Sequence, residues 1–381
     1  MIRFELPSLG ADMDEGTLLE WHVKPGDAVK RGQVVAVVDT SKAAVDVEIW
    51  HDGVIAELLV QPGEKIPVGT VLAILLEADE SPMAAATRRA VSPSARRRAR
   101  ELGVDAERLQ GSGVQGSVTL ADVEAAASAV PAAAAGAAAA SAAVDRAQAM
   151  RQAIAAAMSR SKREIPHYYL SETIPMARAL AWLQQRNQGL PVDERLLPAV
   201  LTLKAVALAL RRTPELNGFY REGSFQAAAA VHAGVAISLR GGGLVAPALH
   251  DVGDKSLAVL MRELTDLVKR ARAGSLRSSE MSDPTVTVTK LGDQGVETVF
   301  GVIYPPQVAL VGFGRVSERP WVVDGSVRAT PVVCATLAAD HRASDGHRGA
   351  LFLAELRDLL QQPQELDEPA PAAATPQASS A

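Results

Sequence analysis

The sequence predicts a chain of several domains: a small β-sandwich, then a small α-helical domain, then a larger α/β domain. A repeat of strand-like segments fills the first 76 residues, stretches rich in Ala, Pro and Ser divide the chain, and helical and strand-like segments alternate after residue 146. A chain of 381 residues suits about two to four domains. We expect domains at 1–76, 91–126 and 146–366, linkers at 77–90 and 127–145, and a disordered tail at 367–381.

Composition narrows the possible locations and partners of the chain. The net charge is -5 and the pI is about 5.9, which argues against nucleic-acid binding by the chain as a whole. The single cysteine, Cys334, excludes an internal disulfide framework and suits the reducing cytoplasm. Residues 125–144 carry no charge, but they are mostly alanine, with few of the large apolar residues that drive insertion, so we predict a linker and no membrane segment. No metal site is predicted.

The first domain is built from an internal repeat. Residues 15–27, EGTLLEWHVKPGD, align with residues 52–64, DGVIAELLVQPGE. Alternating apolar residues bounded by Pro-Gly and Gly predict short strands, and two such halves packed face to face would form a small sandwich with approximate twofold symmetry. The connection between the halves, DTSKA at 39–43, is predicted to be a tight turn with Lys42 at its tip. A rigid turn of this kind can present a lysine to a modifying enzyme.

A basic helix is predicted at the start of the second domain. Ser92 suits an N-cap, Pro93 suits the first helical position and Gly103 suits the end of the helix. A glycine-rich loop at 111–116 precedes a second short helix near Thr119. The arginines between 96 and 100 suit a solvated face, a nucleic-acid contact or a contact with an acidic protein partner.

The third domain combines helices and strands around one core, and it contains a histidine well placed for catalysis. Helical spacing predicts helices at 150–158, 197–212 and 255–273, and strand-like runs lie at 167–174, 231–239, 285–289, 307–312 and 330–337. The last run leads into DHRASDG at 340–346. A strand that delivers His341 to its end, just before a helix, holds a general base rigidly at the edge of a cleft.

Together these features resemble the dihydrolipoamide acyltransferase (E2) component of 2-oxo acid dehydrogenase complexes. The D-x-x-K-A turn is similar to that of lipoyl domains, which implies lipoate in amide linkage on Lys42, although Ser41 stands where the family usually has Asp. The basic helix resembles the peripheral subunit-binding domain, which implies that Arg96 and Arg97 grip acidic residues of the partner enzymes. The third domain resembles the catalytic domain, whose fold is that of chloramphenicol acetyltransferase.

The resemblance also implies a chemistry. Acyl exchange between two thiols requires a base, because a thiol of pKa about 8.5 is mostly protonated at neutral pH, and His341 suits that role. The stretch TVTKLG at 287–292 is similar to a family strand end whose hydroxyl stabilises the oxyanion, which implies that Thr289 is the donor. Asp345, one helical turn after His341, is assigned to orienting the site. The alternative for Thr289 is an ordinary strand threonine. The alternative for Asp345 is an acid that only stabilises the helix N-terminus.

The expected function is therefore transfer of an acyl group from lipoyl-Lys42 to coenzyme A. The resemblance implies a homotrimer that builds a larger core, an active site between subunits, and two partners, the 2-oxo acid dehydrogenase (E1) and the dihydrolipoamide dehydrogenase (E3). The small apolar residues after Gly243 favour an acetyl or short branched group, with acetyl preferred. Two alternatives stay open: a catalytically inactive lipoyl and docking subunit, and the acyltransferase of an acetoin or branched-chain 2-oxo acid complex.

Overall fold

The computed structural model describes residues 1–7, 15–40, 44–76, 150–239, 243–291 and 295–367, together with the isolated positions 98, 119, 120, 123 and 148. Internal contacts divide the chain into two units, one of residues 1–78 with 149–381 and one of residues 79–148. Apart from these isolated positions, the predicted helices of the second domain lie outside the described residues, and so do Arg96 and Arg97.

The N-terminal residues form the predicted β-sandwich. One sheet has the strand order β1-β8-β6-β3 and the other has β5-β4-β2-β7. The strands are β1 (Ile2–Glu5), β2 (Glu15–Trp21), β3 (Ala28–Val29), β4 (Val34–Asp39), β5 (Ala44–Glu48), β6 (Gly53–Leu58), β7 (Lys65–Pro67) and β8 (Val71–Leu76). Their inward side chains, such as Leu18, Val35, Ile55 and Leu72, are completely buried between the sheets.

The sequence repeat is also a repeat of backbone geometry. Gly26 and Gly63 have φ values of 94° and 92°, in the region that only glycine adopts without strain. The two halves exchange hydrogen bonds symmetrically, because Gly26 N donates to Ile55 O and Gly63 N donates to Leu18 O, each at 2.7 Å. One detail differs from the expectation of two separate halves. Each half gives a strand to the other, since β3 pairs with β6 and β7 pairs with β2.

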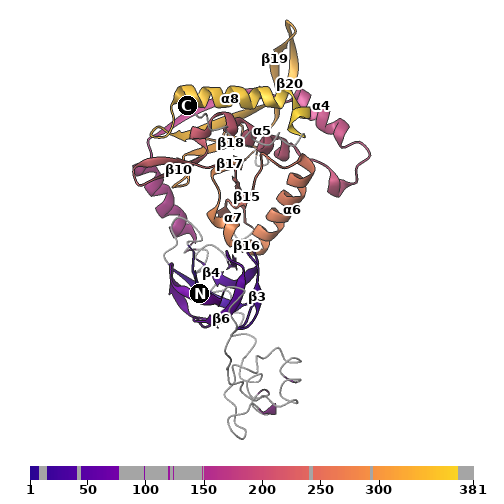
Figure 1. Ribbon diagram of the computed structural model, residues 1–381. Coiled ribbons are helices and arrows are strands. Elements are labelled where there is room, and N and C mark those ends of the chain that lie inside the picture. The colour runs from indigo at the N-terminus through magenta and orange to yellow at the C-terminus, as the bar shows by residue number, and fades with distance from the viewer. Residues whose placement is uncertain are drawn as a thin grey trace, which may run out of the picture. The chain divides into compact units, whose positions relative to one another are not determined.

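The C-terminal residues form the predicted mixed α/β layer. The main sheet has the order β15-β12-β17-β18-β20-β19, and β9 pairs with β20 beside this path. Its strands are β9 (His167–Pro175), β12 (Ala233–Val235), β15 (Ala248–Leu249), β17 (Val286–Lys290), β18 (Ala309–Phe313), β19 (Ser317–Val323) and β20 (Ser326–Asp340). Residues 150–164 are helical, where a helix is predicted at 150–158. The helices that follow are α4 (Ala177–Arg186), α5 (Pro198–Arg212), α6 (Leu257–Ala273), α7 (Ser278–Ser282) and α8 (Gly346–Gln361). Helices α5 and α8 pack against each other, and α8 also contacts β9 and β20 (Figure 1).

Two predicted strands differ from those observed. The run 231–239 is divided into β12 and β13 (Ile237–Ser238), because the chain leaves β17 after Val235 and pairs with β14 (Leu244–Val245) instead. The run 330–337 is longer than predicted, because β19 and the first half of β20 form a hairpin that projects from the domain (Figure 1). Its turn, Asp324-Gly325, has φ values of 51° and 76°, as a two-residue hairpin turn with both central residues at positive φ requires.

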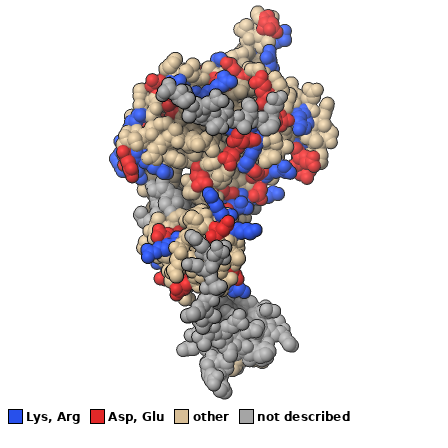
Figure 2. Space-filling view, viewed as in Figure 1, with Lys and Arg blue, Asp and Glu red and all other residues tan. Residues whose placement is uncertain are grey.

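The surface carries charges of both signs. Figure 2 shows acidic and basic side chains intermixed on the face in view, in keeping with the small net charge of the chain. Among the helices of the described residues, none combines the length and the apolar character that crossing a bilayer requires. Within the same residues, no cluster of His, Cys, Asp and Glu is suited to hold a metal ion.

Candidate active site

His341 lies where the sequence placed it, directly after a strand and shortly before a helix. Strand β20 ends at Asp340, which pairs with His167 of β9, and α8 begins at Gly346. The backbone N of His341 donates to Pro166 O at 3.0 Å. The imidazole is exposed and meets the ring of Tyr168 edge-on, with centroids 5.4 Å apart. Nothing in the sequence singled out Tyr168, because its position depends on the pairing of β9 with β20.

An ion pair between the buried Asp340 and the more exposed Arg342 fixes the backbone on both sides of His341. The Asp340 carboxylate is completely buried. It accepts hydrogen bonds from Arg342 Nε at 3.0 Å, from Arg342 Nη2 at 2.7 Å and from Arg342 N at 2.9 Å. This carboxylate raises the pKa of the Arg342 guanidinium above its ordinary value. The guanidinium also lies over the ring of Tyr220, 4.0 Å from its centroid. The bonds between Asp340 and Arg342 therefore hold the two residues that flank His341 in a fixed position.

Replacing Arg342 with methionine is expected to destabilise the domain, because the buried Asp340 carboxylate would lose its cation. Removing one partner of a fully buried pair costs about 3–5 kcal/mol of unfolding free energy, and the partial exposure of Arg342 reduces the expected loss to about 1–3 kcal/mol. Urea unfolding measures this loss, and Arg328→Met on the exposed hairpin strand is the matched control. Equal unfolding midpoints for the two variants would contradict the assigned role of the pair.

Asp345 is the N-cap of α8. Its carboxylate accepts a hydrogen bond from Arg348 N at 2.9 Å, and this bond is the main reason that the pKa of Asp345 is lowered. Within the described residues, no hydrogen bond joins the side chains of Asp345 and His341. The observed contacts are those of a helix cap close to the histidine, and the orienting role stays a prediction.

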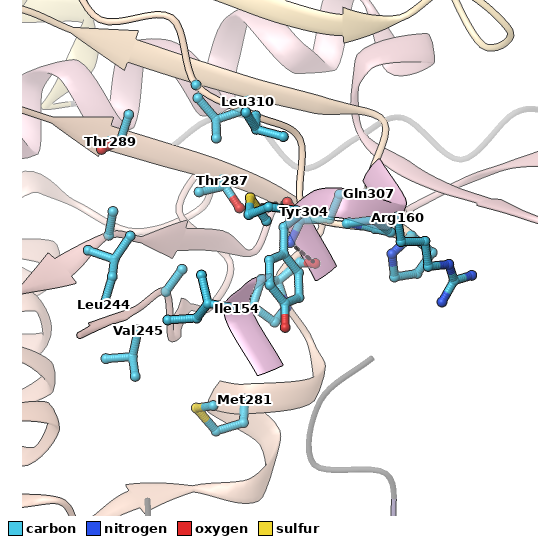
Figure 3. A pocket seen from close by; sticks show the side chains of 18 of the residues that line it. Ile154, Arg160, Leu244, Val245, Met281, Thr287, Thr289, Tyr304, Gln307 and Leu310 are labelled. Carbon is cyan, nitrogen blue, oxygen red and sulfur yellow. Dashed lines mark hydrogen bonds between the residues drawn. The ribbon is translucent and has the colours of Figure 1, made fainter. Parts of the chain in front are cut away.

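Thr289 lines a cavity of about 670 Å³. The threonine stands near the end of β17 and is half-buried. Most of the wall is apolar, and Figure 3 shows Thr289 and Leu310 at one end of the view and Met281 at the other. The apolar lining includes Ile154, Met158, Phe219, Leu244, Val245, Met281, Val302 and Leu310. Such a cavity suits a long, largely apolar substrate arm positioned by a few polar groups.

The hydroxyl of Thr289 is available to a substrate. Its neighbour on the same wall, Thr287, is already engaged, because Thr287 Oγ1 donates to Gln307 Oε1 at 2.7 Å. Gln307 Nε2 in turn donates to Pro284 O at 3.1 Å. Among the described residues, none forms a hydrogen bond with the Thr289 hydroxyl. Of the two threonines at this strand end, Thr289 is therefore the one free to donate into the cavity.

Within a single chain, Thr289 and His341 lie far apart. The sheet register aligns Thr289 of β17 with Gly312 of β18, and Gly312 with Thr336 of β20. His341 lies five positions beyond Thr336 along β20. With about 3.3 Å per residue and about 4.8 Å between strands, the two Cα atoms are separated by roughly 19 Å. His341 is also not among the residues that line the cavity.

The predicted attachment lysine belongs to the connection between β4 and β5. These strands pair antiparallel, and Asp39 lies opposite Ala44. Residues 41–43, including Lys42, lie outside the described residues. The paired strand ends are those of a β-hairpin, the arrangement that the sequence predicts for a displayed lysine.

Comparisons with known proteins cover most of the chain. The sequence model described as 2-oxoacid dehydrogenases acyltransferase (catalytic domain) matches residues 140–367. Two others, described as Biotin-requiring enzyme and e3 binding domain, match residues 2–75 and 89–124. The dihydrolipoyllysine-residue acetyltransferase component of the pyruvate dehydrogenase complex of Zymomonas mobilis is 30% identical over 433 residues, which cover 95% of this chain and 98% of the relative. The three predicted domain types are thereby confirmed.

Two solved structures are similar to the C-terminal domain. One is the dihydrolipoamide acetyltransferase of Azotobacter vinelandii, whose structure was solved to investigate the catalytic roles of a serine, a histidine and an asparagine. It is 27% identical with a TM-score of 0.53, and the match covers 57% of this chain and 90% of that one. The other is the cubic core of a pyruvate dehydrogenase multienzyme complex, with the same identity, TM-score and coverage.

Proposed function

Because the chain belongs to the family of 2-oxo acid dehydrogenase acyltransferases, we propose that it transfers an acetyl group from lipoyl-Lys42 to coenzyme A, with His341 as the general base. The chain is an acyltransferase of a 2-oxo acid dehydrogenase complex, and its first domain carries covalent lipoate. Similar proteins are named for acetyl transfer in pyruvate dehydrogenase complexes, which favours acetyl over a branched or acetoin-derived group. An intact histidine and an open, threonine-lined cavity argue against an inactive docking subunit.

The spacing of the candidate residues supports their roles. In the Azotobacter protein, the histidine follows the serine by the same interval as His341 follows Thr289 here. The asparagine follows that histidine by the same interval as Asp345 follows His341. We therefore assign the hydroxyl role to Thr289 and the base to His341. At position 345 an acid stands in place of the amide, and both side chains can cap a helix.

The chemistry follows from these residue types. The imidazole of His341 accepts the proton of the attacking coenzyme A thiol, whose sulfur then adds to the thioester carbonyl carbon of the acetyl donor. The hydroxyl of Thr289 donates to the oxyanion of the tetrahedral intermediate. As the intermediate collapses, the bond to the dihydrolipoyl sulfur breaks, and His341 returns the proton to that sulfur. The apolar cavity wall keeps water away from the thioester, which limits hydrolysis.

The separation of roughly 19 Å between Thr289 and His341 supports an active site shared between two copies of the chain. Two side chains of one chain cannot act on the same carbonyl over that distance. We place Thr289 of one copy and His341 of the next at each active site. A head-to-tail contact of this kind closes into a ring, and a trimer of such contacts gives three equivalent sites. The cubic core formed by a similar catalytic domain supports an oligomer. Docking of the two partner enzymes on Arg96 and Arg97, and location in the cytoplasm, stay predictions.

Substrate choice is tested with free dihydrolipoamide as acceptor. Acetyl-, propionyl-, isobutyryl-, isovaleryl- and succinyl-CoA are compared by kcat/KM. Acetyl-CoA is expected to be preferred, because similar proteins are named for that group. Preference for a branched donor would assign the chain to a different 2-oxo acid, and no turnover with any donor would overturn the acyltransferase mechanism.

Lysine modification is tested by mass. Intact protein from lipoate-supplied cells is expected to carry one lipoyl adduct, which Lys42→Arg abolishes because arginine has no amine that forms the amide. Lys24→Arg, on an exposed residue of the same domain, should keep the adduct. An adduct that persists in Lys42→Arg would place the modification elsewhere.

A further inference from the structure

Part of the wall of the Thr289 cavity is a segment without regular secondary structure. Most residues between 299 and 307 line the cavity, and Tyr304 is one of them (Figure 3). Residues 298–304 belong to neither a helix nor a strand, so their backbone groups lack the partners that a helix or a sheet supplies. Side chains of other elements must therefore hold this part of the wall in place.

Ile303, in the middle of the segment, is held by side chains of two other elements. Its backbone N donates to His167 Nε2 at 3.1 Å, and its carbonyl oxygen accepts from Ser161 Oγ at 2.6 Å. Ser161 is completely buried in the helical residues 150–164, and His167 is the first residue of β9. The side chain of Ile303 is also buried, in a small hydrophobic cluster with Ile165. These contacts fix the position of both residues that flank Ile303 on the cavity wall.

The two contacts of the His167 ring define its protonation state. Nδ1 lies 2.9 Å from Ile165 O, and because a carbonyl oxygen can only accept, the proton is on Nδ1. Nε2 accepts from the N–H of Ile303 and therefore carries no proton. The neutral ring satisfies both partners, whereas an ionised ring would direct a second N–H at that of Ile303. The contact with the wall thus requires the neutral ring.

The surroundings of His167 favour the neutral ring. Burial lowers the pKa of His167, and the charge of Lys162 acts in the same direction. The bond to Ile165 O and the carboxylate of Asp340, which lies opposite on β20, act in the other direction. Tyr169 stacks on the imidazole with centroids 5.7 Å apart, and its hydroxyl accepts from Lys162 Nζ. The contact with the wall is therefore intact near neutral pH and is lost as the pH falls through the lowered pKa.

We propose that His167 is a positioning residue that holds the wall segment 299–307 through Ile303, and that binding of coenzyme A depends on this contact. This inference rests on the proposed function. Arg160 and Arg221 line the same cavity, and such cations suit the phosphate groups of coenzyme A, so the cavity is assigned to that substrate.

The groups assigned to the chemistry do not depend on the wall segment. Thr289 is carried by β17, and His341 follows the end of β20. Loss of the contact between His167 and Ile303 should therefore weaken the binding of coenzyme A more than it slows the chemical step. Such a loss appears in KM and Kd, with a small change in kcat.

Two substitutions at position 167 separate the acceptor from the rest of the ring. His167→Gln can place a carbonyl oxygen where Nε2 accepts, whereas the shorter side chain of His167→Asn can replace only the Nδ1 donor. In the full chain, His167→Asn is expected to raise the KM of acetyl-CoA about tenfold and to change kcat less than about threefold. His167→Gln should stay close to the wild type. Hydrogen exchange of the Ile303 amide is expected to become about tenfold faster in the asparagine variant alone.

The pH dependence of binding is a readout that a merely structural role would not change. The Kd of coenzyme A is measured by calorimetry, which needs no turnover. Below about pH 6.5 it should rise more steeply for the wild type than for His167→Gln, because the glutamine amide does not ionise. Ionisation of the coenzyme A phosphate and of His341 cancels in this comparison, since both proteins share it. Parallel pH profiles would overturn the dependence on the neutral ring.

The other outcomes separate this proposal from the function on which it rests. Equal Kd values for the asparagine and glutamine variants, or faster exchange of the Ile303 amide with an unchanged Kd, overturn the positioning role. A loss confined to kcat would place His167 in the chemistry and also overturn it. Wild-type protein that binds coenzyme A but transfers no acetyl group to free dihydrolipoamide would overturn the proposed function, and the Kd values would still decide the role of His167. Wild-type protein that does not bind coenzyme A would overturn both.

Discussion

Replacing His341 with alanine is expected to lower kcat for acetyl transfer by a factor on the order of 10²–10⁴. The reason is that no other base would remove the proton from the attacking thiol. Because the imidazole is exposed and its contact with Tyr168 is an edge contact, unfolding in urea should change little. Steady-state transfer from acetyl-CoA to dihydrolipoamide measures the effect.

The matched control is His347→Ala, which removes another exposed imidazole from the first turn of α8. It should retain most of the activity. A loss below tenfold in His341→Ala, or an equal loss in both variants, would remove His341 from the role of base.

Replacing Thr289 with valine is expected to lower kcat by about 10²–10³, the usual effect of removing one oxyanion donor. Valine keeps the branched shape of the side chain but not the hydroxyl, so the cavity wall should stay intact. Thr289→Ser keeps the hydroxyl and should retain activity within a fewfold of the wild type. Equal rates for the serine and valine variants would show that the hydroxyl does not act on the reaction, and Thr289 would then be an ordinary strand residue.

Much of the fold could be predicted because it rests on local patterns. The repeat in the first domain is recognisable from Pro-Gly and Gly residues at equivalent positions of the two halves. The structure shows the same repeat, because Gly26 and Gly63 have matching φ values. The helices α5 and α6 follow from their apolar spacing almost to the residue. The exchange of β3 and β7 between the halves could not be read from the repeat, because both arrangements bury the same alternating side chains.

The candidate site was predictable only in part, for a physical reason. Its residue types lie in short motifs, so His341 and Thr289 could be named from sequence. Their separation depends on the strand order β17-β18-β20 and on the register of each pair, which no local pattern contains. The pairing of Asp340 with Arg342 across His341 depends on burial, which the spacing of charges does not reveal. The cavity joins residues from segments more than 100 positions apart.

The most direct test of the shared active site is to combine the two inactive variants in one oligomer. His341→Ala and Thr289→Val are co-expressed at equal levels, and the mixed particles are assayed for acetyl transfer. If each site takes Thr289 from one copy and His341 from the next, about a quarter of the sites contain both wild-type residues, so activity should return to about a quarter of the wild type. If each chain carries a complete site, every site lacks one residue, and mixed particles no more active than the separate variants would contradict the account.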